Sequence, residues 1–365
     1  MWPKVSIIWL NYNSSRIMPI ILESLESIIN LDYSSDKFEL IIVDNGSNDG
    51  SFERIKEFLE KRNCLRKRII RLSKNFGFTG GNNIGFRSRD KESKYVLLLN
   101  NDAILFQNSL KTLVEYAENN SNVACLQGVV LKYGTRLIDT AGDFLDEFLY
   151  PYILGRRYEY PWILRKPIYV TYVDGSCALY RVESVVKCLG NKLFIDEFFG
   201  YGDDHILGLI MWSHGYKSVA IPEAVASHAR SLTFGKGPTF GRESTFSFYL
   251  SERSRIALTQ ITNTRYKHVM LLYTLNQVLR NVIAYALRGL KIRPENYMRI
   301  QIRAISDGVK LGRKLRRKGI FIDIYKAPII IIPLKYFSCS FIARRIAAKY
   351  FENWYVRILD SLVVE

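Results

Sequence analysis

Cysteine is scarce in this chain of 365 residues, and its few cysteines form no recognisable pair. The five that are present are odd in number and scattered, without a C-x-x-C spacing. This pattern argues against both a disulfide framework and a structural zinc site, because each needs cysteines that can meet in pairs. We therefore expect the protein to fold in a reducing compartment.

Long hydrophobic runs are also lacking. The N-terminal apolar run, Val5–Leu10, has six residues, which is too short for a secretory signal and predicts a first β-strand instead. Two later stretches, 268–287 and 327–343, are apolar but interrupted by polar, basic or proline residues. Since a bilayer-spanning helix needs about 20 predominantly apolar residues, neither stretch qualifies as one.

Two common nucleotide-binding signatures are absent. The glycine- and asparagine-rich turn NFGFTGGNN (75–83) lacks the G-x-G-x-x-G spacing, and the chain has no Walker lysine motif. Nicotinamide-binding and P-loop classes are therefore disfavoured. The turn is nevertheless of the kind whose backbone N–H groups can approach phosphates closely.

Acidic residues are few in the C-terminal part of the chain. The formal net charge is +17, and the residues from Arg265 onward carry 20 Lys and Arg against 6 Asp and Glu. Such a segment predicts an anionic partner, which can be phospholipid head groups, nucleic acid or a phosphate-bearing lipid. Basic clusters such as 313–318 beside the apolar stretches are typical of helices in a membrane interface. The alternative is a basic helical domain that packs on the rest of the protein.

The first 260 residues alternate short β-branched runs with helical stretches. This alternation predicts an α/β fold with a mainly parallel sheet and helices on both faces. The chain is longer than one core usually supports, so we expect a main domain, 1–262, and a basic helical region, 263–365. The expected helices lie near residues 17–30, 51–61, 108–117 and 206–214.

Acidic residues follow two of the predicted strands. Asp44 comes directly after an apolar, β-type run, and Asp102 follows another such run after two asparagines, while Asn11 and Asn13 follow the first run. In an open α/β sheet, ligands bind at the edge formed by the carboxyl ends of the strands. We therefore expect these four side chains to lie at one edge of the sheet.

Each acidic position has a chemical interpretation and a purely structural one. Asp44 can accept hydrogen bonds from a nucleobase or ribose, and Asp102 with its preceding asparagines offers hard oxygen ligands for Mg²⁺ or Mn²⁺. Asp203 or Asp204, ahead of a predicted helix, can take a proton from an acceptor hydroxyl. The alternative is that these residues only form turns and helix caps. His228 is likewise either a structural histidine or a metal ligand.

The chain resembles the family 2 glycosyltransferases, particularly their rhamnosyltransferase-like branch, over about residues 4–260. Seven stretches carry the resemblance in the family's order: VSIIWLNYN, IIVDNGSNDGS, LSKNFGFTGGNNIGF, YVLLLNNDA, VDGSCALYR, LFIDEFFGYGDD and IPEAVASHA. The resemblance implies a GT-A fold, in which a nucleotide-binding α/β domain is joined to an acceptor-binding half.

The resemblance also implies roles for particular residues. Asp102 would chelate the Mg²⁺ or Mn²⁺ that bridges the donor diphosphate, His228 would reach the same ion, and Asp204 would be the general base. The donor side would be formed by Asn13, Asp44, Asn75, Gly77, Asn101 and Asp102.

In the implied reaction, the acceptor oxygen loses its proton to Asp204 and attacks the anomeric carbon opposite the leaving diphosphate. Inversion of configuration follows, and the metal acts as a Lewis acid on the diphosphate. The expected partners are a nucleotide-sugar donor and a glycan or lipid-linked acceptor. The basic C-terminal region leads us to expect a peripheral position at the cytoplasmic face of the cell membrane.

The chain departs from the family pattern near the base. Many relatives carry another acid two residues after it, where this chain has Ile206, and Arg253-Ser254-Arg255 replaces an arginine-asparagine-arginine stretch. These changes concern recognition of the acceptor and the sugar and leave the base and metal positions intact.

Two other functions are open on the sequence alone. A nucleic-acid-binding protein would carry basic residues among exposed aromatics in its main domain, whereas the basic excess here lies in the C-terminal region. A nucleotidyltransferase on a similar sheet would release pyrophosphate instead of a free nucleoside diphosphate.

Overall fold

The computed structural model describes residues 2–62, 66–162, 164–230, 245–267, 294–330 and 360–364, with Leu279 and Ile283, and leaves out the side chains of 294–298. The two apolar stretches expected to lie in a membrane interface fall almost entirely outside the described residues.

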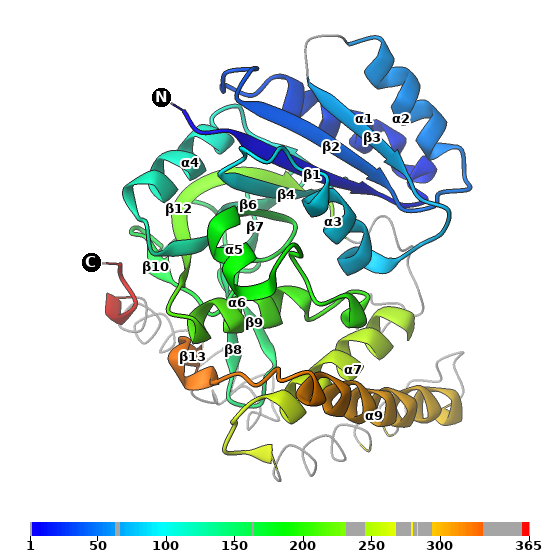
Figure 1. Ribbon diagram of the computed structural model, residues 1–365, viewed down its shortest axis with the longest axis vertical. Coiled ribbons are helices and arrows are strands. Elements are labelled where there is room, and N and C mark those ends of the chain that lie inside the picture. Colours follow the sequence, from blue (N-terminus) through cyan, green and yellow to red (C-terminus); the bar gives the residue numbers. More distant parts are fainter. Residues whose placement is uncertain are drawn as a thin grey trace.

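Strands and helices alternate through the first half of the chain (Figure 1). The strands are β1 (Val5–Asn11), β2 (Phe38–Asp44), β3 (Lys67–Arg71), β4 (Tyr95–Asn100), β5 (Ala103–Leu105), β6 (Val123–Lys132), β7 (Ile138–Thr140), β8 (Asp143–Asp146), β9 (Pro151–Ile153), β10 (Ile168–Tyr169), β11 (Cys177–Arg181), β12 (Lys217–His228) and β13 (Ile329–Ile330). The helices are α1 (Met18–Ile29), α2 (Ser51–Glu60), α3 (Gly77–Arg87), α4 (Ser109–Asn119), α5 (Val182–Leu189), α6 (Asp203–Ser213), α7 (Thr245–Ile261) and α9 (Pro294–Arg317), with short 3-10 turns η1 (Ser15–Ile17), η2 (Asp196–Phe198) and η3 (Ile324–Lys326).

The central sheet has the strand order β10-β12-β6-β11-β4-β1-β2-β3, with β5 paired to β12 and β7 paired to β6. The strands β3, β2, β1 and β4 run parallel, as do β6 and β12. Strand β11 joins these two groups and is antiparallel to both of its neighbours. The predicted α/β class is confirmed, and β11 makes the sheet mixed.

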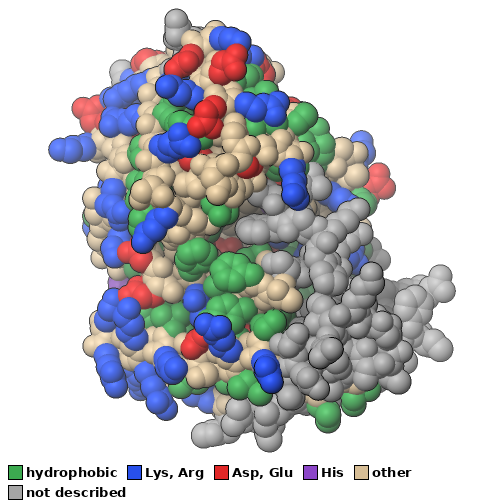
Figure 2. All heavy atoms as spheres, turned by 90° about the vertical axis from the view of Figure 1, so that its right-hand side faces the viewer, with side chains coloured by type: hydrophobic (Ala, Val, Ile, Leu, Met, Phe, Trp, Pro, Cys, Tyr) green, Lys and Arg blue, Asp and Glu red, His purple; other side chains and the backbone are tan. Residues whose placement is uncertain are grey.

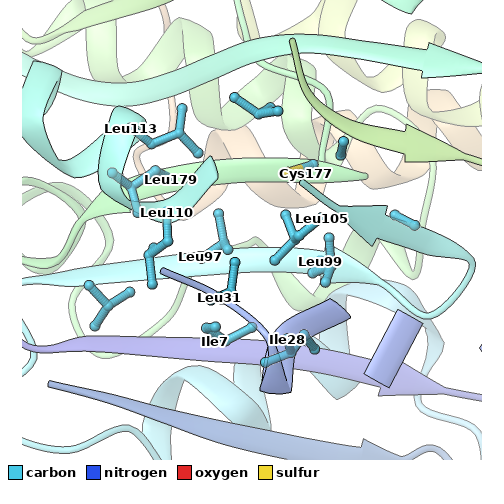
Figure 3. Close-up of a cluster of buried hydrophobic side chains, with 14 of the residues drawn as sticks. Ile7, Ile28, Leu31, Leu97, Leu99, Leu105, Leu110, Leu113, Cys177 and Leu179 are labelled. Atoms are coloured by element: carbon cyan, nitrogen blue, oxygen red, sulfur yellow. The ribbon is translucent and has the colours of Figure 1, made fainter. Parts of the chain in front are cut away.

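Side chains alternate between the two faces of the sheet, and each face is covered by helices. Ile7 and Trp9 of β1 pack with α1, α2 and α4, whereas Ile8 packs with α3, α5 and α6. Figure 3 shows part of the first face, where Ile28 of α1 and Leu110 of α4 lie over Leu97 and Leu99 of β4 and their neighbours. The two faces together hold the sheet rigid and fix where its strands end.

Helix α6 is buried on nearly all sides. Leu207 and Met211 face the sheet, while Ile206 and Leu209 contact a third cluster that also contains residues of α7 and α9. Gly208 allows the close packing, since a Cβ there would lie 2.5 Å from the Thr171 carbonyl oxygen. Ile206, one of the positions where the chain departs from the family pattern it resembles, is thus a core residue.

Helices α7 and α9 lie side by side at the bottom of the molecule in Figure 1. Ala304, Gly308 and Leu315 of α9 recur at helical spacing along the buried side, and a Cβ at Gly308 would lie 2.6 Å from the Arg253 carbonyl oxygen. Small residues at this spacing let two helices approach closely. Among the residues described, no helix is both long and apolar enough to span a bilayer.

One long strand was not predicted from the sequence. Residues 120–175 lack a clear periodicity, yet β6 runs for ten residues, Val123–Lys132, and nine of them are buried. Burial on both faces removes the alternation of polar and apolar residues that marks a half-exposed strand.

Asn83 on α3 connects the sheet to the segment before α6. Its Oδ1 accepts from the N–H groups of Leu193 and Phe194, and its Nδ2 donates to the Phe194 carbonyl oxygen (2.8 Å) and to Asp196 Oδ1 (2.7 Å). The side chain is fully buried. It therefore satisfies backbone groups that water cannot reach.

We expect Asn83→Ala to lower the free energy of unfolding by about 3 kcal/mol, because several buried backbone groups lose their partner. Asn82→Ala is the matched control: Asn82 is equally buried, but its Nδ2 bonds only to Phe78 of its own helix, so we expect a loss of about 1 kcal/mol. Urea denaturation followed by tryptophan fluorescence measures both. Equal losses would show that Asn83 does not connect the two segments.

Candidate active site

The carboxyl ends of β1 and β2 lie next to each other, and polar side chains bond across them. The parallel register sets Asn11 opposite Asp44. Asn11 Nδ2 donates to Asp44 Oδ1 (2.8 Å), and the Ser47 N–H donates to Asp44 Oδ2 (3.0 Å). Asp44 is fully buried, and an ionised carboxylate offers about four lone-pair sites. Its carboxylate therefore holds the loop after β2 and keeps further acceptor capacity.

Asn13 binds the same loop from the other side. Its N–H donates to Ser47 Oγ (3.0 Å), and its Oδ1 accepts from the Asn48 N–H (3.0 Å). Its φ of 47° lies in the left-handed region, which asparagine adopts more readily than most residues. Asn13 and Asp44, both expected on the donor side, are thus joined through one loop.

Asn45, which the sequence analysis did not select, connects this loop to the NFGF turn. Its Nδ2 donates to Asn75 Oδ1 (2.9 Å) and to the Gly77 carbonyl oxygen (3.0 Å), and its Oδ1 accepts from the Phe76 N–H (2.9 Å). At Gly77 the φ is +77°, and a Cβ would lie 2.2 Å from the Phe199 carbonyl oxygen. Only glycine meets both conditions.

Asn101 and Asp102 follow β4 at the same edge. Asn101 Nδ2 donates to Asn11 Oδ1 (3.2 Å), so Asn11 bonds to residues after both of its neighbouring strands. Asp102 Oδ1 lies 3.1 Å from His228 Nε2. Strand β12 brings His228 here because it pairs with Ala103 of β5, the residue after Asp102. The residues expected to bind metal therefore lie together.

His228 is held between two carboxylates. Its Nδ1 lies 3.0 Å from Asp139 Oδ2, on the opposite side of the ring from Asp102. Burial alone would lower the pKa of His228, but the two carboxylates outweigh burial and raise that pKa to about 9. Asp139 lies on β7. Burial alone would raise the pKa of Asp139, but the bond to His228 and the charge of Arg230 outweigh burial and lower that pKa.

Arg230 and Asp174 extend this group. Arg230 Nε donates to Asp139 Oδ2 and Arg230 Nη2 donates to Asp174 Oδ2, both at 2.7 Å. Burial opposes ionisation of Asp174, yet Arg230 and the bond from Ser176 lower its pKa. The sequence analysis assigned no role to these residues. Asp174 lies in the VDGS stretch just before β11, and Arg230 lies two residues after His228. This closeness to motifs of the sequence could have identified both residues.

Asp203 and Asp204 form the first turn of α6, after Gly202 at its N-cap with φ 85°. The Asp204 carboxylate accepts from the N–H of His205 (2.9 Å), and the backbone of Gly175, the residue after Asp174, lies close enough to oppose the rise in the Asp204 pKa. Asp204 is partly exposed, whereas Asp203 is buried. Of the two, Asp204 is the one that a substrate can reach.

Burial raises the pKa of both members of this acidic pair. For Asp203 the negative charge of Asp204 adds to the effect, and the pKa lies well above the usual value. For Asp204, His205 opposes the rise and Asp174 adds to it. A carboxyl group with a raised pKa accepts a proton more readily, which suits a general base.

The donor atoms present fit a metal ion that is shared with a substrate. Across the described part of the chain, no three His, Cys, Asp or Glu side chains are placed to hold an ion by themselves. Asp102 Oδ1 and His228 Nε2, however, lie 3.1 Å apart, close to the about 3 Å that separates neighbouring ligands of an octahedral ion with bonds of about 2.1 Å. Such ions commonly take their remaining ligands from phosphates and water.

The predicted residues fall into one connected set. Hydrogen bonds run from Asp44 through Asn11 to Asn101, and from Asp102 through His228, Asp139 and Arg230 to Asp174. The Gly175 backbone, next to Asp174, lies close enough to the Asp204 carboxylate to affect its pKa. The edge therefore combines a pair of metal-type donors, a loop for a polar ligand and a partly exposed carboxyl group.

Comparisons with known proteins give matches to glycosyltransferases. The family model of glycosyl transferase family 2 matches residues 6–189, which include β1 through α5. An uncharacterized glycosyltransferase of Rickettsia bellii (strain RML369-C) is 27% identical over 181 residues, a match covering 49% of this chain and 23% of that protein. The poly(ribitol-phosphate) beta-N-acetylglucosaminyltransferase TarP of Staphylococcus aureus (strain N315) is 30% identical over 138 residues, or 36% of this chain and 37% of that protein. This chain thus spans well under half the length of either relative.

A solved structure shares the fold. The mannosyltransferase PcManGT from Pyrobaculum calidifontis, in complex with GDP-Man and Mn²⁺, superposes with a TM-score of 0.51 at 17% sequence identity. The superposition covers 87% of this chain and 80% of that chain. The expected GT-A type of fold is therefore confirmed.

Proposed function

This chain belongs to glycosyl transferase family 2, and on that premise we propose that it is an inverting glycosyltransferase. It transfers a sugar from a nucleotide-sugar donor to a hydroxyl group of a glycan or a lipid-linked saccharide. The observation that carries the proposal is the connected edge on which Asp44, Asp102, His228 and Asp204 lie. The names of TarP, a beta-N-acetylglucosaminyltransferase, and of PcManGT, solved with GDP-Man, support it.

The donor binds along the loops after β1, β2 and β3. Asp44 and Asn13 lie at the base and ribose, where Asp44 retains capacity to accept hydrogen bonds. Asn75 and Gly77 shape the turn at the start of α3, and the positive end of this helix dipole favours an anionic diphosphate. Asn101 follows β4 and, through Asn11, connects this region to the metal-binding pair.

Asp102 and His228 are the protein ligands for Mg²⁺ or Mn²⁺. A bound ion supplies a Lewis acid that stabilises the charge developing on the donor diphosphate. Metal ligation requires a neutral ring. His228 therefore loses its Nε2 proton for this role. It keeps the proton on Nδ1, which donates to Asp139, 3.0 Å away. The Mn²⁺ in the PcManGT structure supports a divalent ion.

Asp204 takes the proton of the acceptor hydroxyl. As the proton leaves, the acceptor oxygen forms a bond to the anomeric carbon, and the bond from that carbon to the diphosphate oxygen breaks on the opposite face. The electron pair of the broken bond stays on the nucleoside diphosphate, and the configuration inverts. The raised pKa of Asp204, caused by burial, brings its basicity closer to neutral pH.

The basic C-terminal region, which we place at 263–365, holds the enzyme against the inner face of the cell membrane. On α9, five exposed cations recur at spacings of three, four and seven residues and form a basic stripe: Arg299, Arg303, Lys310, Arg313 and Arg317. This basic stripe lies on the side of the helix opposite the buried residues Ala304 and Leu315. Figure 2 shows Lys and Arg side chains around a group of hydrophobic ones on the lower half of one face, a combination that suits an anionic interface.

We expect Asp204→Asn to abolish sugar transfer and leave donor binding nearly intact, because the amide cannot take up the acceptor proton. Release of free nucleoside diphosphate from a panel of sugar nucleotides measures turnover, and calorimetry measures donor binding. The control is Glu197→Gln. Glu197 forms an ion pair with Lys318, and this variant should keep its activity. Full turnover in Asp204→Asn would refute the assignment. Release of pyrophosphate from nucleoside triphosphates, with no nucleoside diphosphate released from the sugar nucleotides, would indicate nucleotidyl transfer.

The raised pKa of Asp204 predicts the acid side of the pH profile. Its carboxylate is an active base only when ionised, so kcat/KM should fall as the pH drops through this raised pKa, above the value of about 4 for an ordinary aspartate. The measurement is kcat/KM between pH 4 and pH 9. A flat profile down to pH 4 would contradict the role.

Charge reversal on α9 tests the membrane contact. We expect Arg313→Glu with Arg317→Glu to weaken binding to phosphatidylglycerol vesicles by at least about tenfold, since each cation near an anionic surface contributes about 1 kcal/mol. The matched control, Arg87→Glu with Lys91→Glu, changes the net charge equally at exposed positions outside α9 and should bind as the parent does. Equal sedimentation of both variants would rule out the basic stripe, and stronger binding to DNA than to vesicles would favour a nucleic-acid partner.

A further inference from the structure

The Asp102–His228 pair is backed by three further charged side chains that the proposed reaction does not use directly. Asp139, Arg230 and Asp174 continue the line, so that acidic and basic groups alternate over five residues. We propose that Asp139 and Arg230 are positioning residues: Asp139 orients the His228 ring, and Arg230 ties that ring to the segment that holds Asp204. This inference rests on the proposed function and adds two residues to its machinery.

Asp139 determines which ring nitrogen of His228 faces Asp102. A histidine with one bonded nitrogen can turn over and present either nitrogen, but here both nitrogens lie within 3.1 Å of a carboxylate oxygen. A proton on Nδ1 is held by Asp139, which leaves Nε2 as the nitrogen that faces Asp102. Partners of this kind raise the basicity of a ligating histidine and fix its tautomer.

Arg230 holds Asp139 in turn. Its Nε and Nη2 groups bond to two different carboxylates, on Asp139 and Asp174, each at 2.7 Å. The guanidinium is planar, so its two N–H directions are fixed relative to each other. The arginine therefore sets the separation of the two aspartates, which a single lysine ammonium cannot do.

Asp174 carries the connection to the base. Its Oδ1 accepts from the Ser176 N–H (2.9 Å), and its own N–H donates to Gln127 Oε1 (2.9 Å). This turn positions Gly175, whose backbone lies close enough to the Asp204 carboxylate to oppose the rise in its pKa. Arg230 and the turn at Asp174 thus lie between the metal-binding pair and Asp204.

A purely structural ion pair is the alternative, since buried charge pairs also occur without any role in a site. The two interpretations differ in what a conservative change does. A structural pair affects the free energy of unfolding alone, whereas a positioning residue also changes the state of the His228 ring and the affinity for metal.

The first test is Asp139→Asn in the full-length protein, measured without substrate. In ¹H–¹⁵N spectra of ¹⁵N-histidine-labelled protein, which contains four histidines, His228→Gln identifies the His228 signals. We expect Asp139→Asn to shift the Nδ1 signal of His228 and to weaken Mn²⁺ binding by about 10–100-fold, with Mn²⁺ titrated against the loss of the free-ion electron paramagnetic resonance signal.

The control is Asp143→Asn. Asp143 is an equally buried aspartate four residues away, and its carboxylate bonds to Thr140. We expect this variant to leave both the His228 signals and the Mn²⁺ affinity unchanged. A matching loss in the control would mean that replacing any buried carboxyl group in this region has the same effect, and it would overturn the assignment.

A second variant keeps the test decisive if Asp139→Asn does not fold. Arg230→Lys retains a cation that cannot bond to both aspartates in the same way, and we expect a smaller loss of Mn²⁺ affinity. Where both variants fold, the double variant should bind Mn²⁺ no more weakly than Asp139→Asn, because the two residues act through one connection.

The outcomes separate this inference from the proposed function. Unchanged His228 signals in folded Asp139→Asn, or unchanged Mn²⁺ affinity, would overturn the positioning role. If the parent protein binds no Mn²⁺, the metal role in the proposed function fails, and the His228 signals alone then decide whether Asp139 orients the ring.

Discussion

Buried polar groups need hydrogen-bond partners, and at the carboxyl edge of this sheet they bond to one another. Asn11 shows this constraint most clearly. It is fully buried at the end of β1, it donates to Asp44, and it accepts from Asn101. The parallel register of β1 with β2 and β4 makes both bonds possible. A shift of one residue in that register would turn these side chains toward the opposite face of the sheet.

The same constraint continues with charges beyond β4. Asp102, His228, Asp139, Arg230 and Asp174 are stable as a group because each charge meets an opposite one, whereas removal of a single member would leave a buried charge unpaired. The acidic pair at the start of α6 is the exception: burial raises the pKa of both aspartates, and only Asp204 is partly exposed. The edge thus contains one region in which each carboxylate faces a basic group and one carboxyl group, on Asp204, that is partly exposed.

The fold class and the edge could be predicted because both depend on local patterns. Apolar runs end at Asn11, Asp44 and Asn100, and these ends lie side by side as the parallel arrangement requires. Asp139 and Arg230 could not be predicted in the same way, because they are 91 residues apart and meet only through the pairing of β6 with both β7 and β12. Strand β7 has three residues, too few for a periodic pattern. Asn45 was overlooked because its Asn-Gly-Ser surroundings are typical of any turn.

The central claim is that Asp102 and His228 bind one divalent cation together with a donor diphosphate. Electron spin-echo envelope modulation of Mn²⁺ bound to the protein with a nucleoside diphosphate tests it most directly, because the modulation reports nuclei bonded to the ion. The account predicts coupling to one histidine nitrogen, lost in His228→Gln, together with coupling to phosphorus. Bound Mn²⁺ with phosphorus coupling and no nitrogen coupling would contradict it.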